Sequence, residues 1–405
     1  MTGHSFAPDS RDAWLLLSVA LALSTIAGVG LWSSVVVLPV IQAEFGVDRG
    51  GASIPFTATM VAFAVGGVMM GRVADRFGIA LPLVISAVTL GTGYFAAASA
   101  QSYLHFILAH ALLIGMLGAS TTFGPLVAEV SHWFLRRRGI AVAIVASGNY
   151  LAGTVWPPIL QWAVAEVGWR QAFMLTGAFC AVAMLPLILA LRGRTVVDAG
   201  ATPITARPAA MPTSPARLQV LLVAAGIACC VAMSMPQVHI VAYSADLGFG
   251  PARGAEMLSI MLGTGVVSRL ASGLIADRIG GVGTLLLGSA LQCLALFLYL
   301  PFDGLTSLYV VSALFGLAQG GIVPSYALIV RDYFPAREAG WRVSMVLMAT
   351  VGGMALGGWL SGEIYDLTGS YRMAFVNGIA WNLLNLAIAF WLLIGRVWPK
   401  APAPA

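Results

Sequence analysis

The sequence predicts an all-α membrane protein whose twelve transmembrane helices form two pseudo-symmetric six-helix halves. Three observations support this prediction. Hydrophobic residues make up 59% of the 405 residues and charged residues 9%, which is more apolar surface than a soluble fold of this size can bury. The apolar residues form continuous runs and do not alternate, which excludes a β-barrel. Two sequence patterns also occur twice, at one spacing.

Glycines, prolines and charged residues divide the chain into runs of about 20 apolar residues, the length that crosses a bilayer as a helix. We predict spans at 14–38, 52–73, 79–98, 103–128, 139–163, 171–192, 218–243, 254–275, 282–301, 306–330, 340–365 and 373–396. The residues up to Trp14 are polar and lack a cleavable signal peptide, so the first span is expected to be retained.

The longest polar stretch predicts the boundary between the halves. Residues 193–216 are rich in Pro, Ala and Thr, a composition typical of a flexible linker. The predicted organisation is therefore a tail (1–13), a six-helix half (14–192), this cytoplasmic linker, a second six-helix half (217–396) and a second tail (397–405).

Basic residues indicate the orientation, because cytoplasmic loops carry the excess of Lys and Arg. Sixteen basic residues fall on the side of the two termini: Arg11, Arg72, Arg76, Arg136, Arg137, Arg138, Arg192, Arg194, Arg207, Arg217, Arg278, Arg331, Arg337, Arg342, Arg396 and Lys400. The other side holds Arg49, Arg170, Arg253 and Arg372. We therefore expect a multi-pass protein of the cell (inner) membrane with both termini in the cytoplasm.

Two patterns recur with an offset of 202 residues. The octapeptide 71–78, GRVADRFG, returns at 273–280 as GLIADRIG, and WRQAF at 169–173 returns at 371–375 as YRMAF. Both pairs fall in corresponding loops of the two halves. Duplicated halves of parallel topology are typical of alternating-access carriers, which build their site at the interface of the halves.

With these octapeptides the chain resembles the major facilitator superfamily, over essentially its whole length. The resemblance implies the twelve-helix fold of that superfamily. It also implies a cytoplasmic gate in which the turn carboxylates, Asp75 and Asp277, accept hydrogen bonds from a neighbouring helix or pair with arginines such as Arg72, Arg76 and Arg278. The alternative is that the two aspartates are solvated turn residues that help to set the topology.

One charge lies deep within a predicted span. Arg269 precedes Asp277 by eight residues, which places it about 12 Å from the cytoplasmic end of its span. An arginine keeps its proton, so it needs water, an anion or a buried partner. No carboxylate lies at that depth, so a substrate anion is the simplest partner. The alternative is a static strut bonded to helix carbonyls.

A second resemblance concerns the monocarboxylate-porter and oxalate/formate-exchanger branch. It rests on MLSIMLGTGVVSRLASG at 257–273, on WFLRRRGIAVA at 133–143 and on SGN at 147–149. The resemblance implies that Arg269 binds the substrate carboxylate. Proton-coupled relatives often carry an aspartate where this chain has Gly265, and the exchangers add a span-eleven lysine that is absent here. One buried cation favours monoanions over dianions.

Coupling to protons would require a titratable group, and His239 is the candidate. It lies in Pro236-Gln237-Val238-His239 on the seventh span, where the proline permits bending. The alternative is a hydrogen-bonded packing or interfacial histidine.

Further substrate contacts are expected on the spans that line the cavity in this superfamily. These candidates supply hydrogen-bonding groups and aromatic walls that suit a small carboxylate with an apolar tail: Asn149, Tyr150, Gln319, Thr122, Trp32 and Tyr326. Each of them can instead be a helix-packing residue, since membrane bundles use polar contacts widely.

The predicted function is a secondary active transporter, by symport or antiport, of a small organic monoanion. With Lys400 as the sole lysine no Walker motif is possible, and no metal cluster or catalytic triad is evident. We therefore expect no enzymatic activity, no cofactor, no metal and no nucleic-acid partner. The expected partners are a small organic anion, the lipid bilayer and, if transport is coupled, protons; the protein is expected to be a monomer. An exporter of amphipathic compounds or drugs is the alternative function, and a membrane receptor a third.

Overall fold

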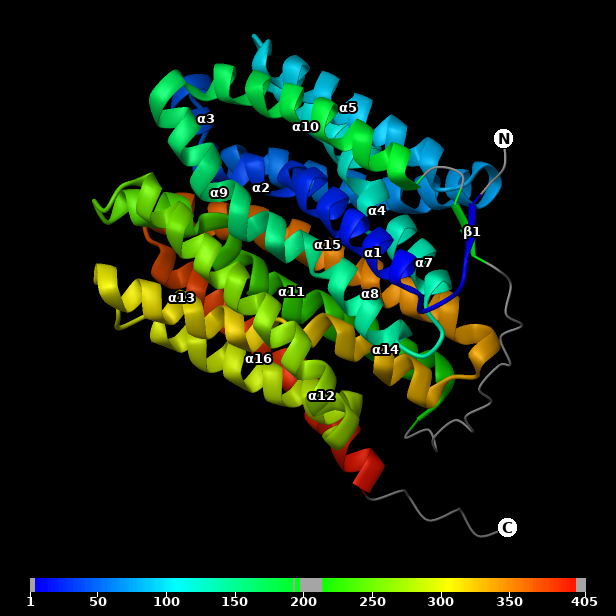
Figure 1. The fold of residues 1–405 in the computed structure, drawn as a ribbon. Helices are drawn as coiled ribbons and strands as arrows, with labels where there is room; N and C mark the ends of the chain where they lie inside the picture. Colours follow the sequence, from blue (N-terminus) through cyan, green and yellow to red (C-terminus); the bar gives the residue numbers. More distant parts are fainter. Residues whose placement is uncertain (1–3, 192–193, 197–212, 398–405) are drawn as a thin grey trace. The chain divides into compact units, whose positions relative to one another are not determined.

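The computed structural model describes residues 4–191, 194–196 and 213–397, and helices account for nearly all of them (Figure 1). In this part of the chain, eleven helical segments are long and apolar enough to span a membrane. One of them, α12 (Pro251–Leu298), has 48 residues and leaves helical geometry at Gly280. Its two arms correspond to two predicted spans, so the expected twelve-span, all-α fold is confirmed.

Two short parallel strands flank the helices of the first half. Strand β1 (His4–Phe6) pairs with β2 (Arg194–Val196), so that His4 lies opposite Arg194. The helices are α1 (Arg11–Ala27), α2 (Val29–Val36), α3 (Leu38–Phe45), α4 (Arg49–Phe77), α5 (Ala80–Ala98), α6 (Tyr103–Leu108), the π-helix η1 (Ala109–Gly118), the 3-10 helix η2 (Ala119–Thr122), α7 (Gly124–Trp133), α8 (Arg138–Ala146), α9 (Gly148–Val167) and α10 (Trp169–Leu191).

The helices of the second half follow in chain order. They are α11 (Pro215–Asp246), α12, α13 (Leu305–Gln319), α14 (Ile322–Tyr333), α15 (Ala336–Thr368) and α16 (Tyr371–Val397). Most of the predicted linker, 193–216, and the end of the C-terminal tail, with Arg192, Arg207 and Lys400, lie outside the described residues.

The described helices group into two compact units. Unit 1 comprises Met1–Thr202 with Ile240–Gly263, and unit 2 comprises Pro203–His239 with Thr264–Ala405. The end of α11 and the start of α12 therefore pack with the first-half helices. This grouping differs from the predicted division at 193–216, because it follows packing and not chain order.

Aromatic side chains fill the core of unit 1, where α5 and α10 run side by side (Figure 1). Tyr94 on α5 lies edge-on to Phe173 on α10, with ring centroids 5.2 Å apart. The buried hydroxyl of Tyr94 donates to Ser33 Oγ at 3.0 Å, so its polar end is satisfied. In unit 2, α14, α15 and α16 pack together, and Tyr299 stacks on Phe375 at 4.8 Å.

The repeated octapeptides form the same turn in both halves. Gly78 ends α4 with φ 77° and ψ 162°, and Gly280 has φ 76° and ψ 171°. A side chain rarely adopts this region of backbone conformation, so the final glycine of each octapeptide lets two helices reverse direction. The pseudo-symmetry predicted from the 202-residue offset is therefore visible in the backbone.

Replacing Gly280 by alanine is expected to lower the free energy of unfolding by about 1–3 kcal/mol, because the Cβ forces a strained backbone. Gly78→Ala is expected to have a similar effect. The measurement is thermal unfolding of the purified protein in detergent. Gly273→Ala is the matched control, since Gly273 is helical and a Cβ there meets no atom within 4 Å. An equal loss for Gly273→Ala and Gly280→Ala would contradict the assignment.

The N-terminal segment is anchored on the loop between α7 and α8. The carboxylate of Asp9 accepts hydrogen bonds from the backbone N–H groups of Leu135, Arg136 and Arg137 at 3.0–3.2 Å. These bonds, that of Arg136 foremost, hold the pKa of Asp9 below its usual value. Trp14 lies edge-on to Phe134 with centroids 5.0 Å apart, which adds an apolar contact.

The lowered pKa of Asp9 predicts a pH-dependent anchor. The ionised carboxylate accepts the backbone bonds, so its stabilising effect is complete above the ordinary value of 3.8 and is lost as the pH falls through the lowered pKa. Asp9→Asn is expected to speed hydrogen exchange of the 135–137 amides several-fold at pH 7. Asp12→Asn, in the first turn of α1, is the control. Indistinguishable exchange rates in the two variants would refute the anchor.

Candidate functional site

Arg269 lies beside a break in the tenth span. The span divides into α13 and α14, with Gly320 and Gly321 between them. Pro324, in the first turn of α14, has no N–H to donate to the Gly320 carbonyl four residues earlier. That carbonyl instead accepts a hydrogen bond from Nε of Arg269 at 3.4 Å. The glycines also admit α12, because a Cβ on Gly320 would lie 2.4 Å from the Gly265 oxygen.

The hydrogen bond between Arg269 and the Gly320 carbonyl leaves the guanidinium able to bind an anion as well. The carbonyl end of a helix carries partial negative charge, which favours a nearby guanidinium. A carbonyl oxygen orients the guanidinium but does not neutralise its full positive charge. Arg269 is only half-buried, so its side chain keeps part of its surface accessible.

Two buried glutamines lie next to this break. Gln237 on α11 donates from Nε2 to Oε1 of Gln319, the last residue of α13, at 2.6 Å. Gln319 is fully buried and Gln237 nearly so. The Nε2 of Gln319 has no hydrogen-bond partner among the described residues. The predicted site residues Arg269 and Gln319 are thus connected through Gly320.

His239 is held at both ring nitrogens. Nε2 lies 2.7 Å from the Gly358 oxygen, so it carries the proton and donates. Nδ1 lies 2.9 Å from the Tyr371 hydroxyl and accepts from it when the imidazole is neutral. The imidazole is fully buried, in a site that satisfies its neutral form. A protonated imidazole would require the Tyr371 hydroxyl to turn and accept.

Three candidates of unit 1, Trp32, Asn149 and Tyr150, lie at the start of α9 or contact it. Trp32 on α2 donates from Nε1 to the backbone oxygen of Asn149 at 3.2 Å. Asn149 Oδ1 is buried and has no hydrogen-bond partner within the described part of the chain. The neighbouring Tyr150 is also buried. Thr122 donates to Ala119 O at 2.8 Å within its own 3-10 turn. Its hydroxyl is therefore engaged locally.

Tyr326 is placed for packing. It is fully buried, and its hydroxyl donates to Oδ1 of Asn385 on α16 at 2.9 Å. Nδ2 of Asn385 donates in turn to Ser289 Oγ at 2.6 Å. These contacts join α14, α16 and the second arm of α12, so Tyr326 uses its polar group inside unit 2. We leave it out of the proposed substrate contacts.

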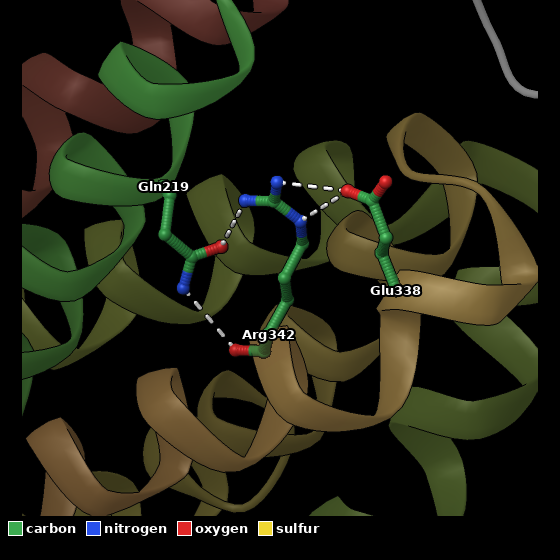
Figure 2. Close-up of polar contacts among 3 residues, drawn as sticks. All are labelled: Gln219, Glu338 and Arg342. Atoms are coloured by element: carbon green, nitrogen blue, oxygen red, sulfur yellow. Dashed lines mark hydrogen bonds and ion pairs between the residues drawn. The ribbon is translucent and has the colours of Figure 1, made fainter.

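A second arginine cluster joins the starts of α11 and α15 (Figure 2). The guanidinium of Arg342 donates to Oε2 of Glu338 from Nε and Nη2, at 3.2 and 2.9 Å. Gln219 donates to the Arg342 backbone oxygen at 3.2 Å. The same guanidinium lies 4.1 Å from the Phe334 ring centroid. Arg342 is therefore matched by a carboxylate and an aromatic ring, as expected for a structural arginine.

The comparison with known families decides what kind of protein carries this site. The model of the Major Facilitator Superfamily matches residues 20–306 and 220–405, nearly the whole chain. The chain belongs to the Major Facilitator Superfamily. Known members of this superfamily that resemble the chain are transporters, so the expectation that it is no enzyme is confirmed.

Curated relatives are similar at low identity. Monocarboxylate transporter 13 of Bos taurus is 27% identical over 388 residues, covering 91% of this chain and 86% of that protein. Monocarboxylate transporter 13 of Rattus norvegicus is 27% identical over 334 residues, covering 80% and 75%. MFS-type transporter 1 of Ophiocordyceps sp. (strain BCC 1869) is 26% identical over 311 residues, covering 75% and 68%.

Solved structures share the fold. A bacterial homologue of the human lysosomal transporter Spinster, inward-facing and unoccupied, is 14% identical with a TM-score of 0.73, covering 98% of this chain and 100% of that one. A POT family transporter in complex with 5-aminolevulinic acid is 12% identical with a TM-score of 0.74, covering 97% and 99%. At these identities the likeness concerns the superfamily fold alone.

The residues of the predicted gate lie on the last turns of α4 and of the first arm of α12, just before Gly78 and Gly280. Asp75, Arg72, Asp277 and Arg278 all have exposed side chains, and Arg76 lies 5.3 Å from the centroid of its neighbour Phe77. No ion pair of either aspartate occurs among the described residues. A gating role for these five residues stays a prediction.

Sequence reasoning did not select Gln237, Tyr371 or Gly320 as site residues. Gln237 lies in the same short motif as His239, and Tyr371 begins the repeated pentapeptide, so both had a local signal. In the first half the matching Trp169 also donates a hydrogen bond, to Glu44 Oε2. The role of the Gly320 carbonyl could have been noticed from Pro324, four residues later.

Proposed function

We propose that this transporter is a secondary carrier of a small organic monoanion, a monocarboxylate, and that Arg269 binds the carboxylate during alternating access. The observation that carries the proposal is the position of Arg269: a half-buried guanidinium on α12, oriented by a broken helix through the Gly320 carbonyl. A carboxylate matches a guanidinium in charge and geometry. The names of two relatives, monocarboxylate transporter 13, agree with this substrate class.

We place the carrier in the cell (inner) membrane with both termini in the cytoplasm, on the basis of the arginine distribution. We also propose Asn149, Tyr150, Trp32 and Thr122 as substrate contacts, together with Gln319, whose chain neighbour Gly320 accepts from Arg269. Thr122 contributes less than the others, because its hydroxyl already bonds within its own turn.

The direct test is uptake by proteoliposomes containing the purified protein. Radiolabelled acetate, pyruvate and L-lactate represent monoanions, succinate and oxalate dianions, and lactamide a neutral analogue. We expect saturable uptake of at least one monoanion, weaker uptake of the dianions and none of lactamide. Uptake of amphipathic cations with none of the monoanions would favour the alternative, an exporter.

His239 is the proposed group for coupling to protons, by transient protonation. Protonation of His239 would reverse its hydrogen bond with the Tyr371 hydroxyl. This gives a specific test, because Tyr371→Phe removes the hydroxyl that bonds Nδ1 of His239. If His239 carries the coupling proton, Tyr371→Phe shifts the pH profile of uptake and His239→Gln removes its pH dependence. If His239 is a packing residue, both variants lose stability and keep the wild-type pH profile.

A further inference from the structure

We propose that Gln237 is a positioning residue for the substrate carboxylate: it fixes the carboxamide of Gln319 so that the amide nitrogen of Gln319 faces the anion. This inference rests on the proposed function and adds a specificity determinant on α11 to it. Two observations support it. The buried carboxamides of Gln237 and Gln319 form a short hydrogen bond, and the buried Nε2 of Gln319 has no acceptor among the described residues.

A carboxamide presents an acceptor at one end and two donors at the other. The Nε2 of Gln237 engages the acceptor of Gln319 at 2.6 Å, so Gln319 is left with its donor end. That Nε2 is buried, and no group in the described residues accepts from it. Leaving a buried donor unpaired costs about 1–3 kcal/mol. A substrate oxygen that accepts from Nε2 of Gln319 would remove this cost and so bind more tightly.

The place of Gln319 in the fold connects this donor to the cation. Gln319 is the last residue of α13, and the next residue, Gly320, holds Nε of Arg269 through its carbonyl. The residue that carries the neutral donor is therefore the chain neighbour of the residue that accepts from a permanent cation. Such a pair of donor and cation suits a carboxylate, whose oxygens accept from both, and it adds no second full charge.

Gln237 decides the polarity of this site. If the carboxamide of Gln319 turned over, it would present an oxygen, and a carboxylate would be repelled. The hydrogen bond from Gln237 favours the orientation in which the nitrogen is presented. Pro236, directly before Gln237, has no N–H to donate and so leaves a backbone carbonyl of α11 without its helix partner.

The test compares near-isosteric apolar variants. Gln237→Met and Gln319→Met are each expected to raise KM for pyruvate or L-lactate about tenfold, equivalent to about 1.4 kcal/mol, with kcat changed less than twofold. Because the two residues act as one unit, the double variant is expected to be no worse than either single variant. Gln237→Glu, which adds negative charge and draws the Gln319 nitrogen toward itself, is expected to raise KM further.

Gln292→Met is the matched control. Gln292 is another fully buried glutamine of unit 2, and its Nε2 donates to the Cys229 carbonyl at 3.2 Å, away from the pair. We expect it to leave KM unchanged. Thermal unfolding of each variant identifies loss of folding, and if Gln237→Met does not fold, Gln237→Asn takes its place with the same expected rise in KM.

The outcomes separate this inference from the proposed function. If the wild-type protein takes up pyruvate and L-lactate in an Arg269-dependent way but Gln237→Met behaves like Gln292→Met, the positioning role is wrong and the carrier function stands. Additive effects in the double variant overturn the positioning role as well. If the wild-type protein takes up none of the monoanions, both proposals fail.

Discussion

Replacing Arg269 by glutamine is expected to lower kcat/KM for monocarboxylate uptake about 100-fold. A charged hydrogen bond to a buried partner contributes up to about 3 kcal/mol, and glutamine supplies neither the charge nor the forked donor. Arg269→Lys keeps the charge but not the Nε–H that reaches Gly320, so we expect an intermediate loss. Both are measured as initial uptake rates in proteoliposomes, at equal protein content.

Arg342 supplies the control for charge removal. Its guanidinium is already matched by Glu338 and by the Phe334 ring, so Arg342→Gln is expected to lower the thermal stability while leaving KM unchanged. Arg269→Gln is expected to show the reverse pattern. Wild-type KM in the Arg269→Gln variant would falsify the carboxylate-binding role.

Removing the charge of Asp246 is expected to destabilise unit 1 by about 2 kcal/mol. Asp246, at the end of α11, accepts from Nη2 of Arg49, the first residue of α4, at 3.0 Å. The Arg49 side chain is 8% exposed, so Asp246→Asn removes a full negative charge that lies 3.0 Å from a largely buried cation. The Asp246 side chain is 30% exposed, so we expect less than the full cost of breaking a buried pair. The measurement is the free energy of unfolding of Asp246→Asn.

The repeat provides a matched control for this pair. Glu44 lies 202 residues before Asp246, and it accepts from Arg170 in an ion pair whose side chains are 34% and 39% exposed. Glu44→Gln is expected to cost less than about 1 kcal/mol, because exposed ion pairs contribute little. The exchange Arg49→Asp with Asp246→Arg should recover part of the loss. Equal costs for Asp246→Asn and Glu44→Gln would show that burial does not set the difference.

Equivalent positions of the two halves therefore differ in their partners. Glu44 pairs with Arg170 of its own half, whereas Asp246 pairs with Arg49 of the other half. Arg372, the counterpart of Arg170, has an exposed side chain. The offset of 202 predicts which residues correspond, but it does not predict which of them pair.

Much of the fold followed from local composition. The apolar runs predicted the spans, and the octapeptide glycines predicted matching turns, which Gly78 and Gly280 form. The interruptions were not predicted: span four contains the π-helix η1 and the 3-10 helix η2, and span ten breaks at Gly320. The hydropathy and length of an apolar run predict a membrane span, but they do not predict where the helix breaks, because breaks depend on how neighbouring helices pack.

The candidate site was predicted only in part. Arg269 was identified because a cation inside an apolar run is costly wherever it points. Tyr326 was selected by its span, and its hydroxyl bonds Asn385. Arg342 was counted only among the basic residues on the side of the termini, although it is largely buried. The polar partners are far apart in the chain, so no sequence window contains both members of a pair.

By itself the sequence determined the twelve apolar helices, the duplication and the presence of an arginine within an apolar span, because the bilayer imposes length, hydropathy and the cost of charge on every segment separately. Tertiary structure alone decided that Arg269 meets the Gly320 carbonyl, that Gln237 meets Gln319 and that His239 meets Tyr371, across 51, 82 and 132 residues. Such contacts are chosen by helix packing, where a buried donor takes whichever acceptor the neighbouring helix brings within reach.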